Sequence, residues 1–270
     1  MLYEDEKNSW TNLNTLEAHL MSTGRKILAF AAVLSLTACA SSRPAVTSDI
    51  HDPHEDANRN VHAFNLALDR NIVRPLSRGY GTAIPEGGRQ VVSNVAEHLG
   101  LPADILNNVL QGDLRNAGNN TARFVVNTVF GVLGTGDMAT GMGIPLRKTD
   151  FGETLHVWGA GEGAYVELPV FGPSTSRDTV GTILDFALDP VSIVLPRPES
   201  YVGTAATFAD QLGNRYDFAD AVDSVLYESA DSYAQARILY LQNRRFELGV
   251  TVEASDVDPF SDPFADPFAQ

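Results

Sequence analysis

The chain is poor in cysteine and in basic residues. One cysteine occurs among its 270 residues, so the chain forms no internal disulfide and no metal site built from several cysteines. The 34 acidic residues exceed the 19 basic ones, which gives a formal charge of −15 and argues against nucleic-acid binding, because that needs a dense basic surface. With 44% hydrophobic residues, the chain has enough apolar side chains for a core, and wholesale disorder is excluded.

The single cysteine, Cys39, ends a pattern typical of exported bacterial lipoproteins. Arg25 and Lys26 precede an apolar run at 27–38, which is shorter than the roughly 20 residues that cross a bilayer and is typical of a secretory signal. The run ends in Leu-Thr-Ala-Cys, which resembles the lipobox, where the cysteine thiol accepts diacylglycerol. We therefore predict a signal peptide at 21–38 and a lipid anchor on Cys39.

The residue after the anchor indicates where the lipoprotein is sorted. Ala40 stands there instead of an aspartate, which favours the outer membrane over retention at the inner one. Two or three acyl chains make the attachment effectively permanent, since each buried methylene contributes about 0.8 kcal/mol. Residues 1–20 are polar, and we interpret them as a dispensable extension or a mis-set start.

The mature chain divides into a tether at 39–51, a helical domain at 52–248 and an acidic tail at 249–270. The tether is small and polar. In the tail, Asp-Pro-Phe occurs three times, and proline at every fourth position forbids a helix. We predict a disordered tail, with a weak docking motif as the alternative.

The first helix of the domain is predicted at about 54–74. Asp52 is placed to cap it, Pro53 suits its first turn, and Pro75 is expected to end it. At 100° per residue, one polar line runs inside an apolar sector of this helix. The line consists of Asn58, His62, Asn65 and Asp69, and its apolar flank includes Phe64 and Leu68.

This polar line has two interpretations. It is either a buried row of hydrogen-bonded side chains, or a polar strip that borders a path for lipid headgroups. In the second case Phe64 and Leu68 would face the lipid tails beside it.

Further elements follow from periodicity, capping residues and breakers. We predict helices at 88–99, 103–111, 114–130, 175–188, 202–228 and 231–247, and a short β-hairpin of 155–158 with 164–168. A capping box, Thr175-x-x-Asp178, marks the start of the fourth of these helices. The prediction is a mostly α fold with at most a short β-hairpin.

A glycine-rich segment follows the helix predicted at 114–130. Its glycines are Gly131, Gly134, Gly136, Gly141 and Gly143. Glycines let helices approach closely or bend, and methionines adapt to irregular surfaces. The segment is either a hinge of a channel or a plain loop between helices.

Catalytic and cofactor motifs are missing from the sequence. No Gly-x-Ser-x-Gly elbow and no Gly-Lys-Ser/Thr loop occurs. The run 134–139 fits a loose dinucleotide fingerprint, but a helix is predicted before it instead of a strand, and Asp137 would repel a pyrophosphate. The sequence therefore predicts no enzyme, no cofactor and no metal site.

Many short motifs in a fixed order resemble the VacJ/MlaA family of phospholipid-binding outer-membrane lipoproteins. They are Asp52-Pro53-x-Glu55-x-x-Asn58-Arg59, Phe64-Asn65, Ile72-Val73-Arg74-Pro75, Ser93-Asn94, Leu110-Gln111-Gly112-Asp113, Arg123-Phe124-x-x-Asn127-Thr128, Asp150-Phe151-Gly152-Glu153-Thr154-Leu155, Gly159-x-Gly161-x-Gly163-x-Tyr165, Leu168-Pro169, Gly172-Pro173-Ser174, Arg177-Asp178, and Tyr233 with Arg237 and Arg244. The resemblance covers about 50–248. Ala57, the stretch 195–225 and the tail depart from the family pattern.

The resemblance implies a single ring-shaped helical domain embedded in the inner leaflet of the outer membrane. An amphipathic channel would take mislocalised phospholipids from the outer leaflet and pass them to a periplasmic lipid carrier, which maintains lipid asymmetry. Trimeric porins are the implied membrane partners. The competing hypotheses are a lipoprotein that only scaffolds porins, and a lipid hydrolase, which the missing elbow disfavours.

Overall fold

A run of helices, interrupted by one short β-hairpin, makes up the part of the chain that the computed structural model describes, residues 50–196, 198–199 and 201–250. These residues belong to one compact unit. The predicted extension, signal peptide, Cys39 anchor, residues 39–49 of the tether and residues 251–270 of the tail lie outside the described residues.

The elements agree with the predicted fold class, which is mostly α with a short hairpin. In chain order they are α2 (Glu55–Leu68), the π-helix η1 (Asp69–Val73), α3 (Arg74–Ala83), α4 (Glu86–Leu110), α5 (Leu114–Val129), α6 (Met138–Gly141), α7 (Phe151–Val157), β1 (Tyr165–Leu168), β2 (Gly172–Thr175), α8 (Ser176–Leu188), α9 (Pro190–Val194), α10 (Tyr201–Asp217), α11 (Ala219–Asp223), the π-helix η2 (Ser224–Glu228) and α12 (Ser232–Glu247). The two strands are antiparallel, with Tyr165 opposite Thr175.

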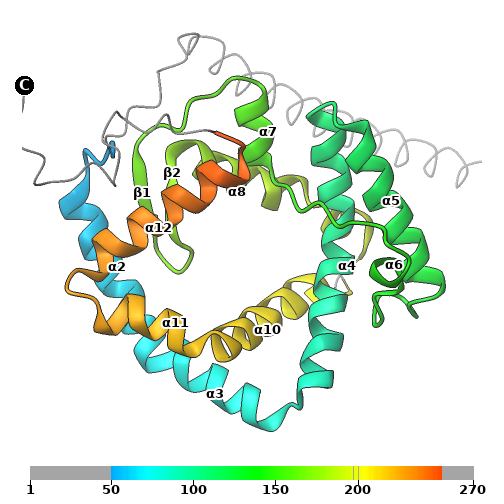
Figure 1. Ribbon diagram of the computed structural model, residues 1–270, viewed down its shortest axis with the longest axis horizontal. Coiled ribbons are helices and arrows are strands. Elements are labelled where there is room, and N and C mark those ends of the chain that lie inside the picture. The colour runs from blue at the N-terminus through cyan, green and yellow to red at the C-terminus, as the bar shows by residue number, and fades with distance from the viewer. Residues whose placement is uncertain (1–49, 197, 200, 251–270) are drawn as a thin grey trace, which may run out of the picture. The chain divides into compact units, whose positions relative to one another are not determined.

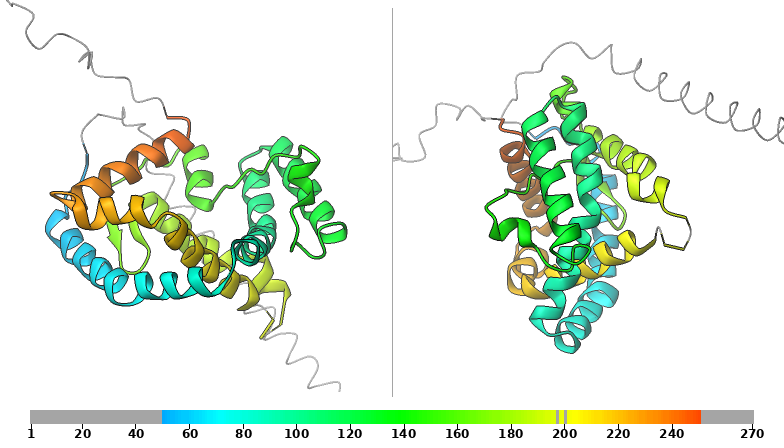
Figure 2. Two further views of the ribbon diagram at one scale, coloured as in Figure 1. Left: turned by 60° about the horizontal axis from the view of Figure 1, so that its bottom comes forward. Right: turned by 90° about the vertical axis from the view of Figure 1, so that its right-hand side faces the viewer.

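Within this unit the elements follow one another around a ring (Figure 1). α3 and α10 pack together along one side, and α10 also packs on α4. α4 and α5 run side by side (Figure 2). The hairpin contacts α2, α8 and α12, and α7 packs on α8, so segments far apart in sequence close the arrangement.

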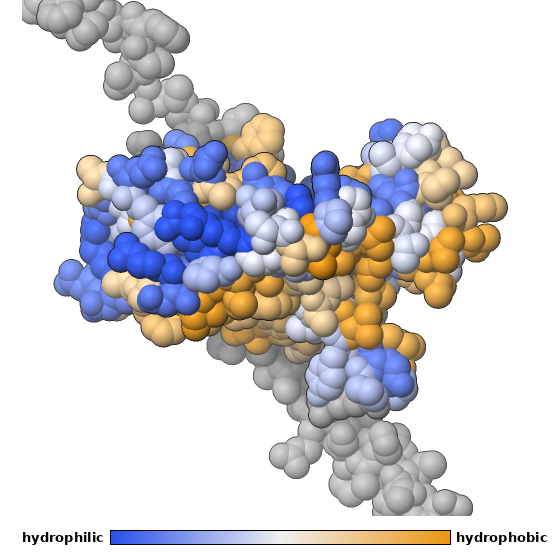
Figure 3. Space-filling model, turned by 90° about the horizontal axis from the view of Figure 1, so that it is seen from below, coloured by the Kyte–Doolittle hydropathy of each residue, from blue (hydrophilic) through white to orange (hydrophobic). Residues whose placement is uncertain are grey.

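The interior is unusually polar and the exterior unusually apolar. Among the described residues, nine hydrophobic side chains are buried, against seventeen polar or charged ones. Thirty large hydrophobic side chains are exposed in the same part of the chain. Figure 3 shows apolar side chains gathered in a band along one side of the unit, with hydrophilic side chains along the other. Contiguous apolar surface of this extent marks a membrane or protein contact.

None of the described helices combines the length and the hydropathy that crossing a membrane requires.

The helix predicted at 54–74 differs at both ends. It begins at Glu55, where His54 is the N-cap, because the Asp52 carboxylate is used elsewhere and accepts hydrogen bonds from Asn58, Tyr233 and Arg237. At the other end the chain stays helical past Pro75. The π-turn η1 widens the helix before Pro75, which then lies in the first turn of α3, where a missing N–H is tolerated.

Three further predictions of secondary structure are wrong. The single helix expected at 202–228 is divided into α10, α11 and the π-helix η2. The helices expected at 88–99 and 103–111 form one helix, α4, with Pro102 inside it. Proline inside a helix costs about 3 kcal/mol, and packing of α4 on both α5 and α10 offsets that cost. Residues 155–158 were expected to be a strand but belong to α7 and its C-cap, because Asp150 caps a helix there and β1 pairs with β2 instead.

Candidate functional site

The first three residues of the predicted polar line hold the β-hairpin against α2. Asn58 donates from Nδ2 to the Tyr165 carbonyl at 3.2 Å and accepts from the Glu167 N–H at 3.0 Å. Asn65 makes the same kind of pair one turn later, donating to the Leu168 carbonyl at 2.9 Å and accepting from the Val170 N–H at 2.8 Å. The two amides therefore extend the hairpin edge as a third strand would.

His62 lies between the two asparagines and links the hairpin to α12. Its Nδ1 is 3.2 Å from Glu167 Oε1, and its Nε2 is 3.0 Å from Ser232 Oγ. The imidazole edge also contacts the Tyr233 ring, with centroids 5.6 Å apart. His62 is buried, so it works as a bridge inside the fold.

Asp69, the last residue of the line, holds α10 and η2 against η1. Arg215 donates to both of its carboxylate oxygens at 2.9 Å, and the Tyr227 hydroxyl donates at 2.7 Å. Burial by itself would raise the pKa of Asp69, but the hydrogen bonds from Arg215 and Tyr227 outweigh it and lower the pKa. Arg215 also donates to Asp223 at 2.6 Å.

These contacts match the first interpretation of the polar line, a hydrogen-bonded row. Asn58 and His62 are buried, and Asn65 and Asp69 are half-buried. Phe64, on its flank, is 52% exposed, and Leu68 is half-buried. The structure thus brings the polar atoms to the hairpin and the late helices and leaves Phe64 at the surface. A role for the line along a lipid path stays a prediction.

The glycine-rich segment is tightly folded at its start. The Gly136 N–H donates to the Gly131 carbonyl at 2.8 Å, and a Cβ on Gly134 would lie 2.4 Å from the His98 ring. Val132 and Leu133 both have left-handed backbone angles, with φ of 50° and 56°, and both side chains are 71% exposed. Such angles are strained in a β-branched residue and are typical of functional loops.

The second half of the segment is looser. α6 begins after Asp137, which accepts from the Thr140 N–H, and a Cβ on Gly141 or Gly143 would meet no atom within 4 Å. Gly143 has φ of 75°, which favours glycine. The hinge role predicted for the five glycines remains untested.

A pocket of about 360 Å³, which was not predicted from the sequence, opens between the hairpin, α8 and α12. Its walls differ in chemistry. Leu168, Phe171 and Pro173 of the hairpin form an apolar side, and Phe171 contacts Phe186 edge to face. The other side is polar and comprises Asp150, Ser174, Asp178, Thr182, Asp185, Tyr240, Asn243, Arg244 and Glu247.

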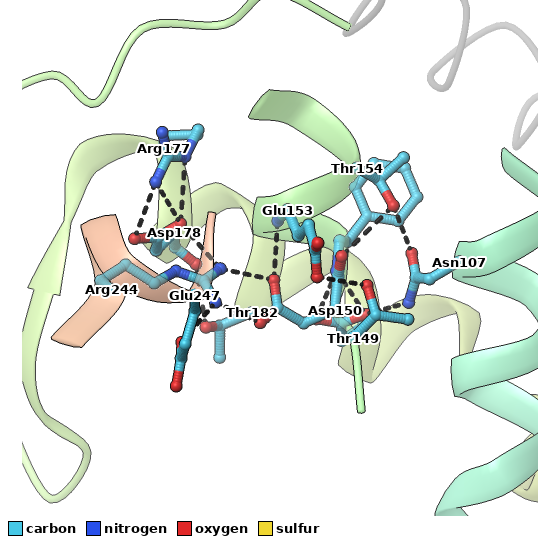
Figure 4. Close-up of polar contacts among 12 residues, drawn as sticks. Asn107, Thr149, Asp150, Glu153, Thr154, Arg177, Asp178, Thr182, Arg244 and Glu247 are labelled. Atoms are coloured by element: carbon cyan, nitrogen blue, oxygen red, sulfur yellow. Dashed lines mark hydrogen bonds and ion pairs between the residues drawn. The ribbon is translucent and has the colours of Figure 1, made fainter. Parts of the chain in front are cut away.

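Arg244 organises the polar wall (Figure 4). It donates to both oxygens of Asp150, at 2.6 and 2.8 Å, and to Asp178 at 3.1 Å, and it lies 3.3 Å from Glu247. Burial would lower the pKa of Arg244, but the hydrogen bonds from its guanidinium to Asp150 and Asp178 raise it. Tyr240 donates to Asp178 at 2.8 Å. The guanidinium therefore stays charged. Its two terminal nitrogens donate to carboxylates, while its Nε–H is buried without a hydrogen-bond partner.

Glycine is required where α7 and α8 cross beneath this wall. A Cβ on Gly181 would lie 2.3 Å from the Gly152 nitrogen, and a Cβ on Gly152 would lie 2.5 Å from Asp178 Oδ1. The backbones can meet only without side chains at these positions. This close crossing brings Asp150 and Asp178 near enough to share Arg244.

Two half-buried carboxyls fix the segment that leads into α7. Asp185 accepts from the Phe151 N–H at 3.1 Å and from Asn107 Nδ2 at 3.2 Å. Asp104 accepts from the Thr149 N–H at 3.0 Å. Burial raises the pKa of Asp185 and raises that of Asp104 to about 7.

A sequence model of the MlaA lipoprotein family matches residues 50–247, which is most of the chain. The chain belongs to the MlaA lipoprotein family. The intermembrane phospholipid transport system lipoprotein MlaA of Shigella flexneri is 37% identical over 216 residues, covering 78% of this chain and 83% of the relative. MlaA of Escherichia coli strain K12 is 36% identical over the same shares. These names describe a transport lipoprotein and not an enzyme.

A solved MlaA-like structure agrees with the fold. It comes from work on the structural basis for maintenance of bacterial outer membrane lipid asymmetry, has a TM-score of 0.62 and 29% sequence identity, and covers 73% of this chain and 98% of its own. An uncharacterized protein of Rickettsia felis is also similar, 31% identical over 190 residues, covering 70% of this chain and 74% of the relative. The family resemblance inferred from the motifs is thereby confirmed.

Proposed function

We propose that this MlaA-family protein is an outer-membrane lipoprotein that takes mislocalised phospholipids from the outer leaflet and passes them to a periplasmic lipid carrier. The relatives in Shigella flexneri and Escherichia coli are named for intermembrane phospholipid transport. The observation that carries the proposal is a pocket with one apolar and one polar wall inside a unit whose exterior is apolar along one side.

The apolar exterior supports a position within one leaflet. Exposed side chains such as Ile72, Leu76, Phe208 and Phe218 would each gain about 1.5–3 kcal/mol on burial in lipid. The hydrophilic side seen in Figure 3 would then face the periplasm. The Cys39 anchor predicted from the sequence would add acyl chains to the same leaflet.

The two-sided pocket supports passage of an amphiphile. Exposing two acyl chains of about 15 methylenes each to water costs roughly 20 kcal/mol or more, and drawing a charged headgroup through hydrocarbon costs several kcal/mol. A passage avoids both costs if the tails lie along Leu168 and Phe171 while the headgroup lies along the polar wall. The hinge role that the sequence predicts for Gly131, Gly134, Gly136, Gly141 and Gly143 is a separate proposal, because none of these glycines lines this pocket.

Partners follow from the two surfaces. We assign the apolar exterior to lipid and to trimeric porins in the same membrane, and the hydrophilic side to the periplasmic carrier. The alternative function is a scaffold for porins that conducts no lipid. A scaffold would use the apolar exterior as a contact surface and would not require the pocket.

A bulky residue in the pocket separates these two functions. Thr182 lines the pocket, and its hydroxyl donates a hydrogen bond to the Asp178 carbonyl at 2.9 Å. Thr182→Phe should block the passage, so that phospholipid accumulates in the outer leaflet, measured by labelling whole cells with a membrane-impermeant amine reagent and quantifying the labelled lipid. Normal asymmetry with normal protein abundance and porin association would favour the scaffold.

The matched control lies on α3. Thr82 is exposed on a helix and makes the same local hydrogen bond, to the carbonyl of residue 78 at 2.7 Å. Thr82→Phe adds the same apolar bulk outside the pocket. It should leave lipid asymmetry unchanged.

A further inference from the structure

The pocket carries an excess of negative charge. Four carboxyls line it, those of Asp150, Asp178, Asp185 and Glu247, against the guanidinium of Arg244. Arg177 does not line the pocket but pairs with Asp178, so the net charge is −2 when all six groups are ionised. Burial raises the pKa of Asp185, but a net of −1 remains even with that carboxyl protonated. A phosphate group by itself would be repelled from such a wall.

The terminal nitrogens of Arg244 are not free to bind a phosphate, and its Nε–H is buried. Its guanidinium already donates to Asp150 and Asp178 and contacts Glu247. By contrast, two of the carboxylates retain capacity, because the Asp150 and Glu247 side chains are 41% and 48% exposed. A carboxylate offers about four lone-pair sites, so both can accept further hydrogen bonds.

We infer that the pocket selects phospholipids whose headgroup carries a primary ammonium. This inference rests on the proposed function, because it names the substrate class of the same passage. An ammonium brings three charged N–H donors to the exposed carboxylates, whereas phosphatidylglycerol offers only neutral hydroxyl donors and carries a net negative charge that the wall repels. Phosphatidylethanolamine has the required group and phosphatidylglycerol lacks it.

The pocket also favours a primary over a quaternary ammonium. A quaternary ammonium has no N–H donor and is typically held by several aromatic faces. Phe171 and Tyr240 are the aromatic residues that line this pocket, and the Tyr240 hydroxyl is bonded to Asp178. Carboxylate acceptors outnumber aromatic faces, so phosphatidylcholine should bind less well than phosphatidylethanolamine.

The test measures which lipids the protein takes up. The full-length lipidated protein, purified in detergent, is mixed with vesicles of equimolar phosphatidylethanolamine, phosphatidylcholine and phosphatidylglycerol, repurified, and its bound lipid is quantified by mass spectrometry. Wild type should enrich phosphatidylethanolamine over both other lipids. One unit charge about 6 Å away at an effective dielectric of about 60 changes binding roughly fivefold. Glu247→Gln should therefore lower the ratio of phosphatidylethanolamine to phosphatidylglycerol about fivefold, and Glu247→Lys should lower it further.

Glu228 supplies the control, because it is exposed in η2 and does not line the pocket. Glu228→Gln and Glu228→Lys make the same charge changes and should leave the lipid ratio at the wild-type value. Enrichment of phosphatidylglycerol, equal uptake of all three lipids, or a ratio that Glu247→Gln does not change would each overturn the inference. In these cases lipid is still bound, so the proposed function stands. Absence of bound lipid from wild type would overturn both.

Discussion

Replacing Arg215 by methionine should be one of the most damaging single changes in the domain. Its side chain is 8% exposed and holds η1 and α11 to α10 through Asp69 and Asp223. Methionine keeps the bulk but leaves two carboxylates without their main partner. Removing one member of a buried ion pair costs about 3–5 kcal/mol. For a domain of this size, that lowers the melting temperature by about 6–20 °C.

The measurement is thermal unfolding in detergent micelles, followed by circular dichroism. Arg78→Met is the matched control, because Arg78 lies 4.0 Å from the same Asp223 carboxylate but is 60% exposed. That exposed pair should contribute about 1 kcal/mol or less. Adding Asp69→Asn to Arg215→Met should restore part of the lost melting temperature, because it removes the Asp69 charge that Arg215 no longer pairs with. If Arg215→Met and Arg78→Met melt within about 2 °C of each other, the assigned role of Arg215 is wrong.

Two further predictions concern packing and pH. Gly181→Ala should destabilise the domain by about 1–3 kcal/mol, because its Cβ would lie 2.3 Å from the Gly152 nitrogen. In the same melting assay Gly118→Ala, on α5 with no atom within 4 Å of its Cβ, should be neutral or stabilising, and equal effects of the two would contradict the packing argument. Burial raises the pKa of Asp104 from 3.8 to about 7, so its contribution to stability is complete below pH 4 and is lost as the pH rises to 7. Asp104→Asn should therefore reduce the fall in melting temperature between pH 4 and pH 8, and an unchanged pH profile would rule out Asp104 as its source.

Local signals in the sequence predicted several elements correctly. The Thr175 capping box starts α8, where Thr175 Oγ1 accepts from the Asp178 N–H at 3.2 Å. The helix expected at 114–130 is α5 within one residue. The polar line on α2 was visible as a periodicity, but its partners lie about 100 residues away in the hairpin. Periodicity identifies the polar face of a helix but does not identify the residues that this face contacts in the folded chain.

The errors and the missed pocket have a shared cause, which is tertiary packing. Proline was expected to end a helix at Pro75 and at Pro102, but the chain stays helical at both. A π-turn precedes Pro75, and packing against neighbouring helices stabilises α4 around Pro102. The pocket wall joins Asp150, Asp178 and Arg244, which are separated by up to 94 residues. All three occur in the family motifs, and that was the only signal in the sequence that could have pointed to them.

The polar interior has a thermodynamic consequence. Apolar surface raises the heat capacity when it becomes hydrated, while polar surface lowers it. Among the described residues, more polar than apolar side chains are fully buried, and thirty large apolar ones remain exposed. Calorimetry should accordingly give a small heat-capacity increment, and the stability curve should be nearly flat over the growth range of the cell.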